Sequence, residues 1–222
     1  TNISGSRRIL KGAVRDHVLG ITAVNGRGEI IKSGGRVMKN VTGYDLARTL
    51  VGSWGTLAVM CEVALKVLPV QRETRTLVFF GLKDYAAVEA VCIAMGTPYE
   101  VSGTVHLHGP LAARLSDADL AGTGGAVTAI RVESFPASAR YRTSRLREAL
   151  LAYEPQLELD TERSQAFWKD VRSLKMFQDV NYPLWRVSTV PSKAATLVGN
   201  LARKIDVRAV YDWSGGLIWI ET

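Results

Sequence analysis

Positions 34–46 of the chain read GGRVMKNVTGYDL, and positions 52–57 read GSWGTL. Within the first string, Thr42 and Asp45 have the spacing of a capping box, in which both side chains satisfy amide donors at a helix N-terminus. Four apolar residues then fall on one helical face: Leu46, Ala47, Leu50 and Val51. We therefore expect a short helix here, followed by a tight corner that leads into a strand.

Glycines set the turns around this helix. Gly52 can take the left-handed conformation that ends a helix, and Gly55 allows a second turn before a strand over 56–61. Other strands are expected over 18–24, 29–32 and 63–68. The first two are joined by NGRG, which has hairpin-turn chemistry, and Pro69 ends the last. The first part of the chain is therefore expected to be mostly sheet.

Strands and helices alternate in the rest of the chain. Asp84 and Ser192 stand where helix N-caps are expected, and Gly96 stands where the first of these helices ends. This order, with antiparallel returns, predicts an α+β sandwich with helices on one face of a sheet. A boundary near 69–74 gives domains at 1–72 and 73–222. The expected strands cover 76–80, 101–107, 126–132, 185–190, 207–212 and 217–221, and the expected helices cover 84–95, 138–153, 164–174 and 192–201.

The composition is that of an ordinary globular protein, with 47% hydrophobic and 22% charged residues among 222. No apolar run approaches the roughly 20 residues that span a bilayer, so direct membrane insertion is not expected. The net charge is +7. No aromatic ladder interleaves the basic residues as single-strand binders require, which favours a solvated surface over nucleic-acid binding. A basic patch can also serve an anionic cofactor, a substrate or an acidic partner. The densest basic cluster is Arg140, Arg142, Arg145 and Arg147.

The other short motifs favour structure over chemistry. Cys61 and Cys92 lie inside apolar stretches, as buried thiols of a cytoplasmic protein do. His106 and His108 point to one face of a strand, but no cysteine or carboxylate at suitable spacing completes a zinc site, so no metal is expected. GTGG at 122–125 lacks the lysine of a P-loop, which leaves a linker before a strand. The sequence also has no G-x-S-x-G nucleophile elbow.

Several strings together resemble one protein family. They are KNVTGYDL and VGSWGTLAVMCEVALKVLP, TNISGSRR and KGAVRDHVLG near the start, and LWRVS and DWSGGLIW near the end. Over nearly all its length the chain resembles the vanillyl-alcohol-oxidase, or PCMH-type, FAD-binding flavoproteins, and within them the FAD-binding subunits of glycolate oxidase. The resemblance implies the second half of a PCMH-type FAD-binding domain over 1–72, then a ferredoxin-like α/β sandwich cap domain over 73–222. The family string GSEGTLG departs here at Trp54 and Ala58, which removes its polar side chain at position 54.

The first twenty residues contain the best candidates for a binding site. Glycines in this segment allow close approach of the backbone to a flat or charged ligand, and exposed amides in such turns can form an anion-binding nest. From the residues alone, ordinary loop positions are the simpler interpretation. The resemblance implies that Asp16 orients the loop and that FAD contacts six other residues. These are Asn2, Ser4, Gly5, Gly12 and Val14 along the flavin, and Val59 at the adenine end.

Arg186 is the most interesting basic residue of the second domain. A guanidinium on a strand can pair through two hydrogen bonds with a small carboxylate substrate. Strand arginines are more often surface residues with packed stems, and that alternative stays open. Trp213 and Trp219 are expected to pack rather than to react.

The resemblance also implies an activity. It implies an FAD-dependent subunit of a complex that oxidises a small 2-hydroxy acid, glycolate to glyoxylate, beside a second flavin subunit and an iron–sulfur subunit. The expected location is the cytoplasm or the cytoplasmic face of the inner membrane. The alternatives are a non-catalytic FAD-carrying or assembly subunit of the same complex, and a basic module that binds nucleic acid. The family's pyrophosphate-binding subdomain is expected before residue 1, so this stretch alone is expected to bind FAD weakly.

Overall fold

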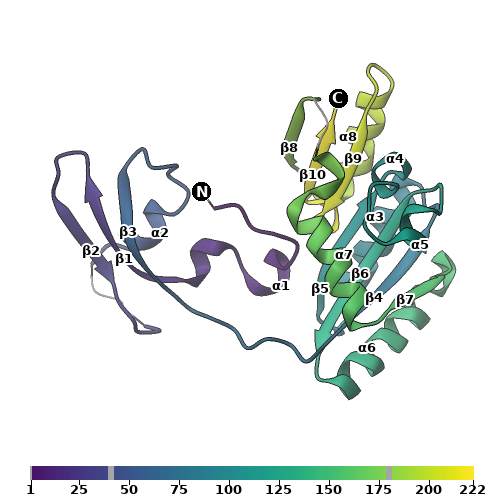
Figure 1. Ribbon diagram of the computed structural model, residues 1–222, viewed down its shortest axis with the longest axis horizontal. Helices are drawn as coiled ribbons and strands as arrows, with labels where there is room; N and C mark the ends of the chain where they lie inside the picture. Colours follow the sequence, from purple (N-terminus) through teal and green to yellow (C-terminus); the bar gives the residue numbers. More distant parts are fainter. Residues whose placement is uncertain (1, 40–42, 179–181) are drawn as a thin grey trace. The chain divides into compact units, whose positions relative to one another are not determined.

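The computed structural model describes residues 2–39, 43–178 and 182–222. The chain divides into two compact units, Thr1–Val70 and Gln71–Thr222 (Figure 1). Each unit has its own sheet and its own apolar core.

The first unit is a small antiparallel sheet with the strand order β2-β1-β3. Its hairpin turn follows β1 as predicted, and the Asn25 side-chain oxygen accepts hydrogen bonds from the Arg27 and Glu29 amides. Helix α2 buries Ala47 and Leu50 against this sheet. The elements are α1 (Arg8–Lys11), a 3-10 turn (Val14–His17), β1 (Val18–Asn25), β2 (Ile30–Gly34), α2 (Leu46–Leu50) and β3 (Ala58–Leu65).

The N-cap of α2 differs from the predicted capping box. Thr42 lies outside the described residues, and Asp45 caps the helix by accepting a hydrogen bond from the Arg48 amide. The helix therefore begins at Leu46, one turn later than expected. The predicted turn glycines are confirmed, with φ of +103° at Gly52 and +79° at Gly55.

The two strands expected over 56–68 are a single strand, β3. A bulge separates the pairs Thr22–Glu62 and Ala23–Met60, which leaves Cys61 as the extra residue. Cys61 is exposed, so the expectation of a buried thiol was wrong there, because its position in an apolar string does not decide which side faces the core.

Two glycines allow β1 and β2 to approach closely. Gly20 pairs with Gly34, whose φ is +72°. A Cβ built at Gly34 would lie 2.1 Å from the Leu19 carbonyl oxygen, and one at Gly20 would lie 2.4 Å from the Gly35 nitrogen. Backbone contact within the sheet therefore requires glycine at positions 20 and 34.

The second unit is an antiparallel sheet with the strand order β7-β4-β6-β5-β9-β10-β8. Most of the predicted strands are confirmed, while the short edge strand β7 was missed. The strands are β4 (Glu73–Phe80), β5 (Val101–Leu107), β6 (Val127–Ser134), β7 (Leu157–Leu159), β8 (Leu184–Ser188), β9 (Arg208–Asp212) and β10 (Leu217–Glu221). The helices are α3 (Asp84–Met95), α4 (Gly109–Ala112), α5 (Ala118–Ala121), α6 (Pro136–Ala149), α7 (Thr161–Ser173) and α8 (Ala194–Ala202).

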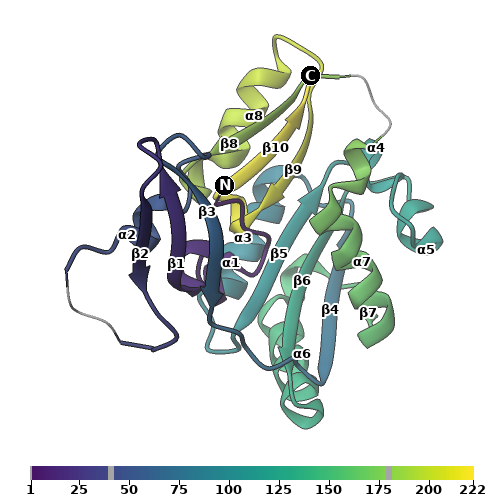
Figure 2. The same ribbon diagram turned by 60° about the vertical axis from the view of Figure 1, so that its left-hand side comes forward.

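Helices cover both faces of this sheet, which corrects the predicted one-sided sandwich (Figure 2). Leu77 and Phe79 of β4 pack on the face of α3 and α6, together with Leu146. The intervening Val78 points to the other face and packs with Phe167 of α7. Because successive strand residues alternate between faces, the unbroken apolar run of β4 needs cover on both sides.

A short pairing joins the two parts of the sheet. Strands β5 and β9 are paired only over Val105–Asp212, His106–Tyr211 and Leu107–Val210 in the described residues. Beyond these pairs, the His108 amide donates to the Ala209 carbonyl oxygen at 3.1 Å. We call this pairing the β5–β9 seam, because it connects β7-β4-β6-β5 to β9-β10-β8.

Candidate functional site

The first residues of the chain form a loop closed by side-chain hydrogen bonds to backbone amides. The Val14 amide donates to the Ser4 hydroxyl oxygen at 3.1 Å, and the Arg15 amide donates to the Asn2 side-chain oxygen at 3.1 Å. Asp16 accepts from the Ala13 amide at 2.7 Å. Sequence-predicted residues are thus brought together in one loop whose shape their own side chains fix.

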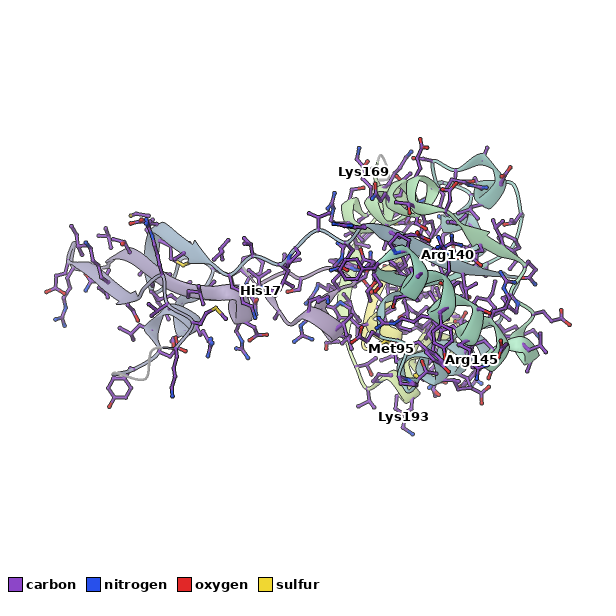
Figure 3. All side chains as sticks on the ribbon, turned by 90° about the horizontal axis from the view of Figure 1, so that it is seen from below. His17, Met95, Arg140, Arg145, Lys169 and Lys193 are labelled. Atoms are coloured by element: carbon purple, nitrogen blue, oxygen red, sulfur yellow. The ribbon has the colours of Figure 1, made fainter. Side chains whose placement is uncertain are left out.

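The predicted glycines of this loop differ in their surroundings. Gly12 has φ of +89°, and a Cβ there would lie 3.2 Å from an Asp16 carboxylate oxygen, so the loop itself requires a glycine. Around Gly5, by contrast, no atom lies within 4 Å of a built Cβ. His17, labelled in Figure 3, ties the end of the loop to the backbone because its Nε2 lies 2.8 Å from the Lys11 carbonyl oxygen.

Val59 lies apart from the loop, on β3, where it pairs with Val24 near the end of β1. Its side chain is 65% exposed, and Val14 is 41% exposed. Both are apolar surfaces that a flat ring system can cover. The structure therefore places Asn2, Ser4, Gly12 and Val14 together and Val59 on a separate strand.

In the second unit, Arg186 lies on the edge strand β8, where it pairs with Trp219 of β10. Its guanidinium lies 5.4 Å from the centre of the Trp213 ring and 5.7 Å from that of Trp219. These are cation–π distances, and the arginine side chain is exposed. Two indole rings therefore hold a cation at the surface, where an anion can reach it.

The turn that carries Trp213 is strained. Trp213 and Ser214 have φ of +53° and +57°, and Gly215 follows with +96°. A left-handed conformation at a non-glycine residue costs roughly 1–3 kcal/mol and persists where its surroundings impose it. Here the Ser214 amide donates to the Thr104 hydroxyl oxygen at 2.9 Å, which anchors the turn to β5. Nothing in the sequence DWSGG indicates left-handed residues before the glycines.

A third cluster contradicts an expectation from the sequence. Asp84 is the first residue of α3, but its carboxylate does not cap the helix. It lies 3.3 Å from His106 Nε2 and 3.1 Å from His108 Nε2, and it accepts a hydrogen bond from the Tyr211 hydroxyl. One ligand atom from each of Asp84, His106 and His108 lies within 4.8 Å of the others. A carboxylate therefore does accompany the two histidines, which no sequence spacing could show.

Burial and hydrogen bonding shift the pKa values of this cluster. Burial by itself would raise the pKa of Asp84, but hydrogen bonds from His106, His108 and Tyr211 and the charge of His108 bring it far below its usual range. Burial raises the pKa of Tyr211, and its hydrogen bond to the carboxylate raises it further. Burial also lowers the pKa of His106, against the opposing effect of Asp84. The carboxylate is therefore ionised and the phenol neutral at physiological pH.

The basic cluster on α6 is neutralised by carboxylates. Figure 3 labels Arg140 and Arg145, which project from this helix. Each of the four arginines forms an ion pair, which supports the solvated-surface interpretation. The pairs are Arg140–Glu73, Arg142–Glu100, Arg145–Glu148 and Arg147–Glu158.

In the part of the chain that the structure describes, no helix is long and apolar enough to cross a membrane.

Comparisons with known proteins find relatives among glycolate oxidase subunits and FAD-linked oxidoreductases. No protein-family model matches it. It is 32% identical over 221 residues to the glycolate oxidase subunit GlcE of Escherichia coli, an alignment that covers 99% of this chain and 53% of GlcE. The chain thus spans about half the length of that relative. It is also 42% identical over 90 residues to the glycolate oxidase subunit GlcD of Bacillus subtilis, covering 40% of this chain and 19% of GlcD.

Further comparisons agree. An uncharacterized FAD-linked oxidoreductase of Mycobacterium tuberculosis is 49% identical over 69 residues, covering 31% of this chain and 15% of that protein. Among solved structures, p-cresol methylhydroxylase matches with a TM-score of 0.64 at 11% identity, covering 93% of this chain and 51% of that one. That likeness shows a shared fold, the PCMH-type arrangement expected from the sequence. The chain is thus similar over 99% of its length to the glycolate oxidase subunit GlcE, and over shorter stretches to GlcD and to an FAD-linked oxidoreductase.

Proposed function

We propose that this chain is part of an FAD-binding subunit of a glycolate oxidase-type complex, which oxidises a small 2-hydroxy acid. The observation that carries the proposal is the 32% identity to GlcE across 99% of the chain. The second unit is included in that alignment, so the similarity is not confined to the sheet of the first unit. The division at Val70 supports an FAD-binding part followed by a cap domain.

The first unit is the proposed site of FAD contact. The open space at Gly5 and the exposed valines at 14 and 59 suit a ligand with a flat ring. Asn2 and Ser4 hold the loop amides, and Asp16 fixes its turn, so these residues position the backbone. When bound, a flavin supplies the acceptor for the hydride equivalent from the substrate α-carbon.

Arg186 is the proposed contact for the substrate carboxylate. Its guanidinium can form two parallel hydrogen bonds to a carboxylate while its faces stay on the indoles of Trp213 and Trp219. The strained turn at 213–215 supports this role, because strain of this kind is concentrated at functional sites.

The proposed partners follow from the names of the relatives. GlcE and GlcD are both described as subunits of glycolate oxidase, so a second flavin subunit is the first expected partner. An iron–sulfur subunit that takes the electrons onward is the second. The proposed location is the cytoplasm or the cytoplasmic face of the inner membrane, reached through these partners.

A non-catalytic FAD-carrying or assembly subunit is the second candidate. The loop residues Asp16 and His17 favour this candidate. Both are residue types that serve as acids or bases in catalysis, but here each side chain is engaged in a hydrogen bond with a backbone atom of the loop. A subunit of this kind would hold flavin that glycolate does not reduce.

The proposal is tested on the assembled complex that contains this chain. Flavin absorbance is recorded for this subunit and for the complex, before and after anaerobic addition of glycolate. The proposed function predicts bound flavin that is bleached by glycolate. Bound flavin that stays oxidised supports the non-catalytic subunit, and a folded subunit with no flavin in any assembly refutes both.

A further inference from the structure

Two histidines and a carboxylate meet beside the β5–β9 seam. His106 lies near the end of β5, His108 follows the last residue of that strand, and Asp84 is the first residue of α3. Residues two apart on an extended strand share one face, so both imidazoles reach the Asp84 carboxylate. Side chains that are 22 and 24 positions apart in the sequence therefore direct one ligand atom each to a common point.

The distances between these ligand atoms are close to those around a tetrahedral metal ion. Asp84 Oδ1 lies 3.3 Å from His106 Nε2 and 3.1 Å from His108 Nε2. Metal–ligand bonds of about 2.0–2.2 Å at a tetrahedral centre separate neighbouring nitrogen and oxygen ligands by about 3.3–3.5 Å. The two Nε2 atoms lie within 4.8 Å of each other, so small rotations of the rings let all three atoms bind one ion.

Neighbouring side chains hold two of the three ligands as metal sites require. The Tyr211 hydroxyl donates to Asp84 Oδ2, which leaves Oδ1 for an ion. His106 Nδ1 lies 2.8 Å from the Thr128 hydroxyl oxygen, which can accept the ring proton and so leave a lone pair on Nε2. Hydrogen bonds of this kind orient metal ligands, and their loss typically weakens metal binding about 10-fold to 100-fold.

His108 is the ligand whose hydrogen bonding must change. Its Nδ1 accepts from the Ala209 amide at 3.2 Å, so without an ion the ring proton is on Nε2 and points to Asp84. A cation at Nε2 moves that proton to Nδ1, where it faces the Ala209 N–H, and this one hydrogen bond is lost. The loss weakens binding about tenfold, which is small beside the affinity that three ligands give a Zn²⁺ ion.

The ligand set selects among cations. Imidazole nitrogens favour Zn²⁺ and its transition-metal neighbours, whereas Mg²⁺ and Ca²⁺ prefer oxygen ligands. One carboxylate and two neutral imidazoles leave a divalent ion with one unit of positive charge and, at a tetrahedral centre, one open position. The side chains of Asp84 and His108 are 26% and 21% exposed, so water or a small anion can reach that position.

We propose that Asp84, His106 and His108 bind Zn²⁺ or a neighbouring first-row transition-metal ion, with Tyr211 and Thr128 as positioning residues. The ion joins the start of α3 to the end of β5 and, through Tyr211, to β9. The inference does not depend on the proposed function, since it uses only contacts within the second unit.

The test is titration of the full chain with Zn²⁺, followed by calorimetry, and with Co²⁺, followed by visible absorption. We expect saturable binding of one ion per chain by either metal, and no binding of Mg²⁺. The Co²⁺ spectrum should show d–d bands without the charge-transfer band of a thiolate ligand, which would instead indicate the exposed Cys61. Nitrogen-15 shifts should show that bound Zn²⁺ places the ring protons of His106 and His108 on Nδ1 and leaves His17 unchanged.

Three variants separate the ligands from their surroundings. Asp84→Asn keeps the size of the side chain but removes its charge, so it should weaken Zn²⁺ binding roughly 100-fold or more. Tyr211→Phe removes only the hydrogen bond to Oδ2 and should weaken binding about 10-fold. His17→Asn changes the remaining histidine of the chain, in the first unit, and should bind Zn²⁺ as the wild type does.

The wild-type chain decides the proposal even if a variant does not fold. A wild type that binds neither Zn²⁺ nor Co²⁺ stoichiometrically overturns it and leaves the cluster as a hydrogen-bonded network only. Binding that shifts His17 alone, that shows thiolate ligation, or that is unchanged in Asp84→Asn also overturns it, in favour of an adventitious ion only.

Discussion

A single methyl group at Gly34 is expected to destabilise the sheet of the first unit. Gly34 has φ of +72°, and a Cβ there would lie 2.1 Å from the Leu19 carbonyl oxygen and 2.9 Å from the Gly20 Cα. Both neighbours are backbone atoms of the paired strand, so neither can move without disturbing the β1–β2 pairing. Gly35 is the matched control, since no atom lies within 4 Å of a Cβ built there and its φ is not in the left-handed region.

The size of the effect is the sum of two costs. A left-handed conformation costs an alanine about 1–2 kcal/mol, and overpacking costs about 1–3 kcal/mol, so Gly34→Ala should lose about 2–5 kcal/mol. At the same time, Gly35→Ala should be neutral or stabilise by about 0.4–1 kcal/mol, because alanine restricts the unfolded chain.

Hydrogen exchange followed by mass spectrometry measures this in the full chain. Peptides from β1 and β2 should exchange roughly 30-fold to several-thousand-fold faster in Gly34→Ala, in line with about 1.4 kcal/mol per factor of ten. Peptides from the second unit serve as an internal reference. Equal protection of β1 and β2 in Gly34→Ala and Gly35→Ala would refute the close-approach explanation of the glycine pair.

Three other outcomes are expected. Arg163 donates two hydrogen bonds of 2.9 Å to Asp117 and lowers the pKa of that carboxyl, so Arg163→Gln should cost about 1 kcal/mol or less at pH 7. A lowered carboxyl pKa stabilises the fold above the unfolded value of about 4, so denaturation curves of variant and wild type should converge as the pH falls below it. Arg186→Met should raise the KM for glycolate in the assembled complex about 10-fold to 100-fold, because it removes a charged hydrogen-bonded pair. Thermal unfolding should be nearly unchanged because the Arg186 side chain is exposed. An unchanged KM would exclude Arg186 as the carboxylate contact. Because the α6 arginines are paired, gel-shift assays should show no salt-sensitive retardation of nucleic acid, and retardation that weakens steeply with salt would reverse this interpretation.

The sequence predicted the elements whose pattern is local. Strands β5 and β10 have the predicted bounds, and β10 begins with the unbroken apolar run LIWI directly after a pair of glycines. The helical turn at Asp45 was predicted one turn too early, because Thr42 and Asp45 both have N-cap chemistry and only the packing of Leu50 decides between them. The edge strand β7 was missed, because its pairing with β4 covers only three residues.

Contacts between distant parts of the chain could not be predicted from the spacing of residues in the sequence. The period of α7 shows that Phe167 faces a core but not which face of the sheet it covers. The apolar run of β4 was the available signal that both faces are covered. Asp84 has the chemistry of an N-cap. Only the fold shows that its carboxylate is hydrogen-bonded instead to His106 and His108, more than twenty positions later in the sequence.

The candidate site likewise has contacts that are local in the sequence and could be predicted, and one long-range contact that could not. Asn2, Ser4 and Asp16 close one loop through contacts over 3 to 13 positions, a range that sequence reasoning can reach. The left-handed Trp213 is imposed by the Thr104 contact to the neighbouring Ser214, 110 positions away, and has no local signature.

Flavin content is the most direct test of the central proposal, that the first unit supplies part of an FAD site in a 2-hydroxy-acid oxidoreductase. The assembled complex should show flavin absorbance assigned to this subunit, and a bulky substitution at the open position, Gly5→Trp, should reduce the bound FAD while Gly26→Trp in the hairpin turn, equally open, should not. A complex that folds and assembles with its full flavin content in both variants would contradict the placement of FAD at this loop.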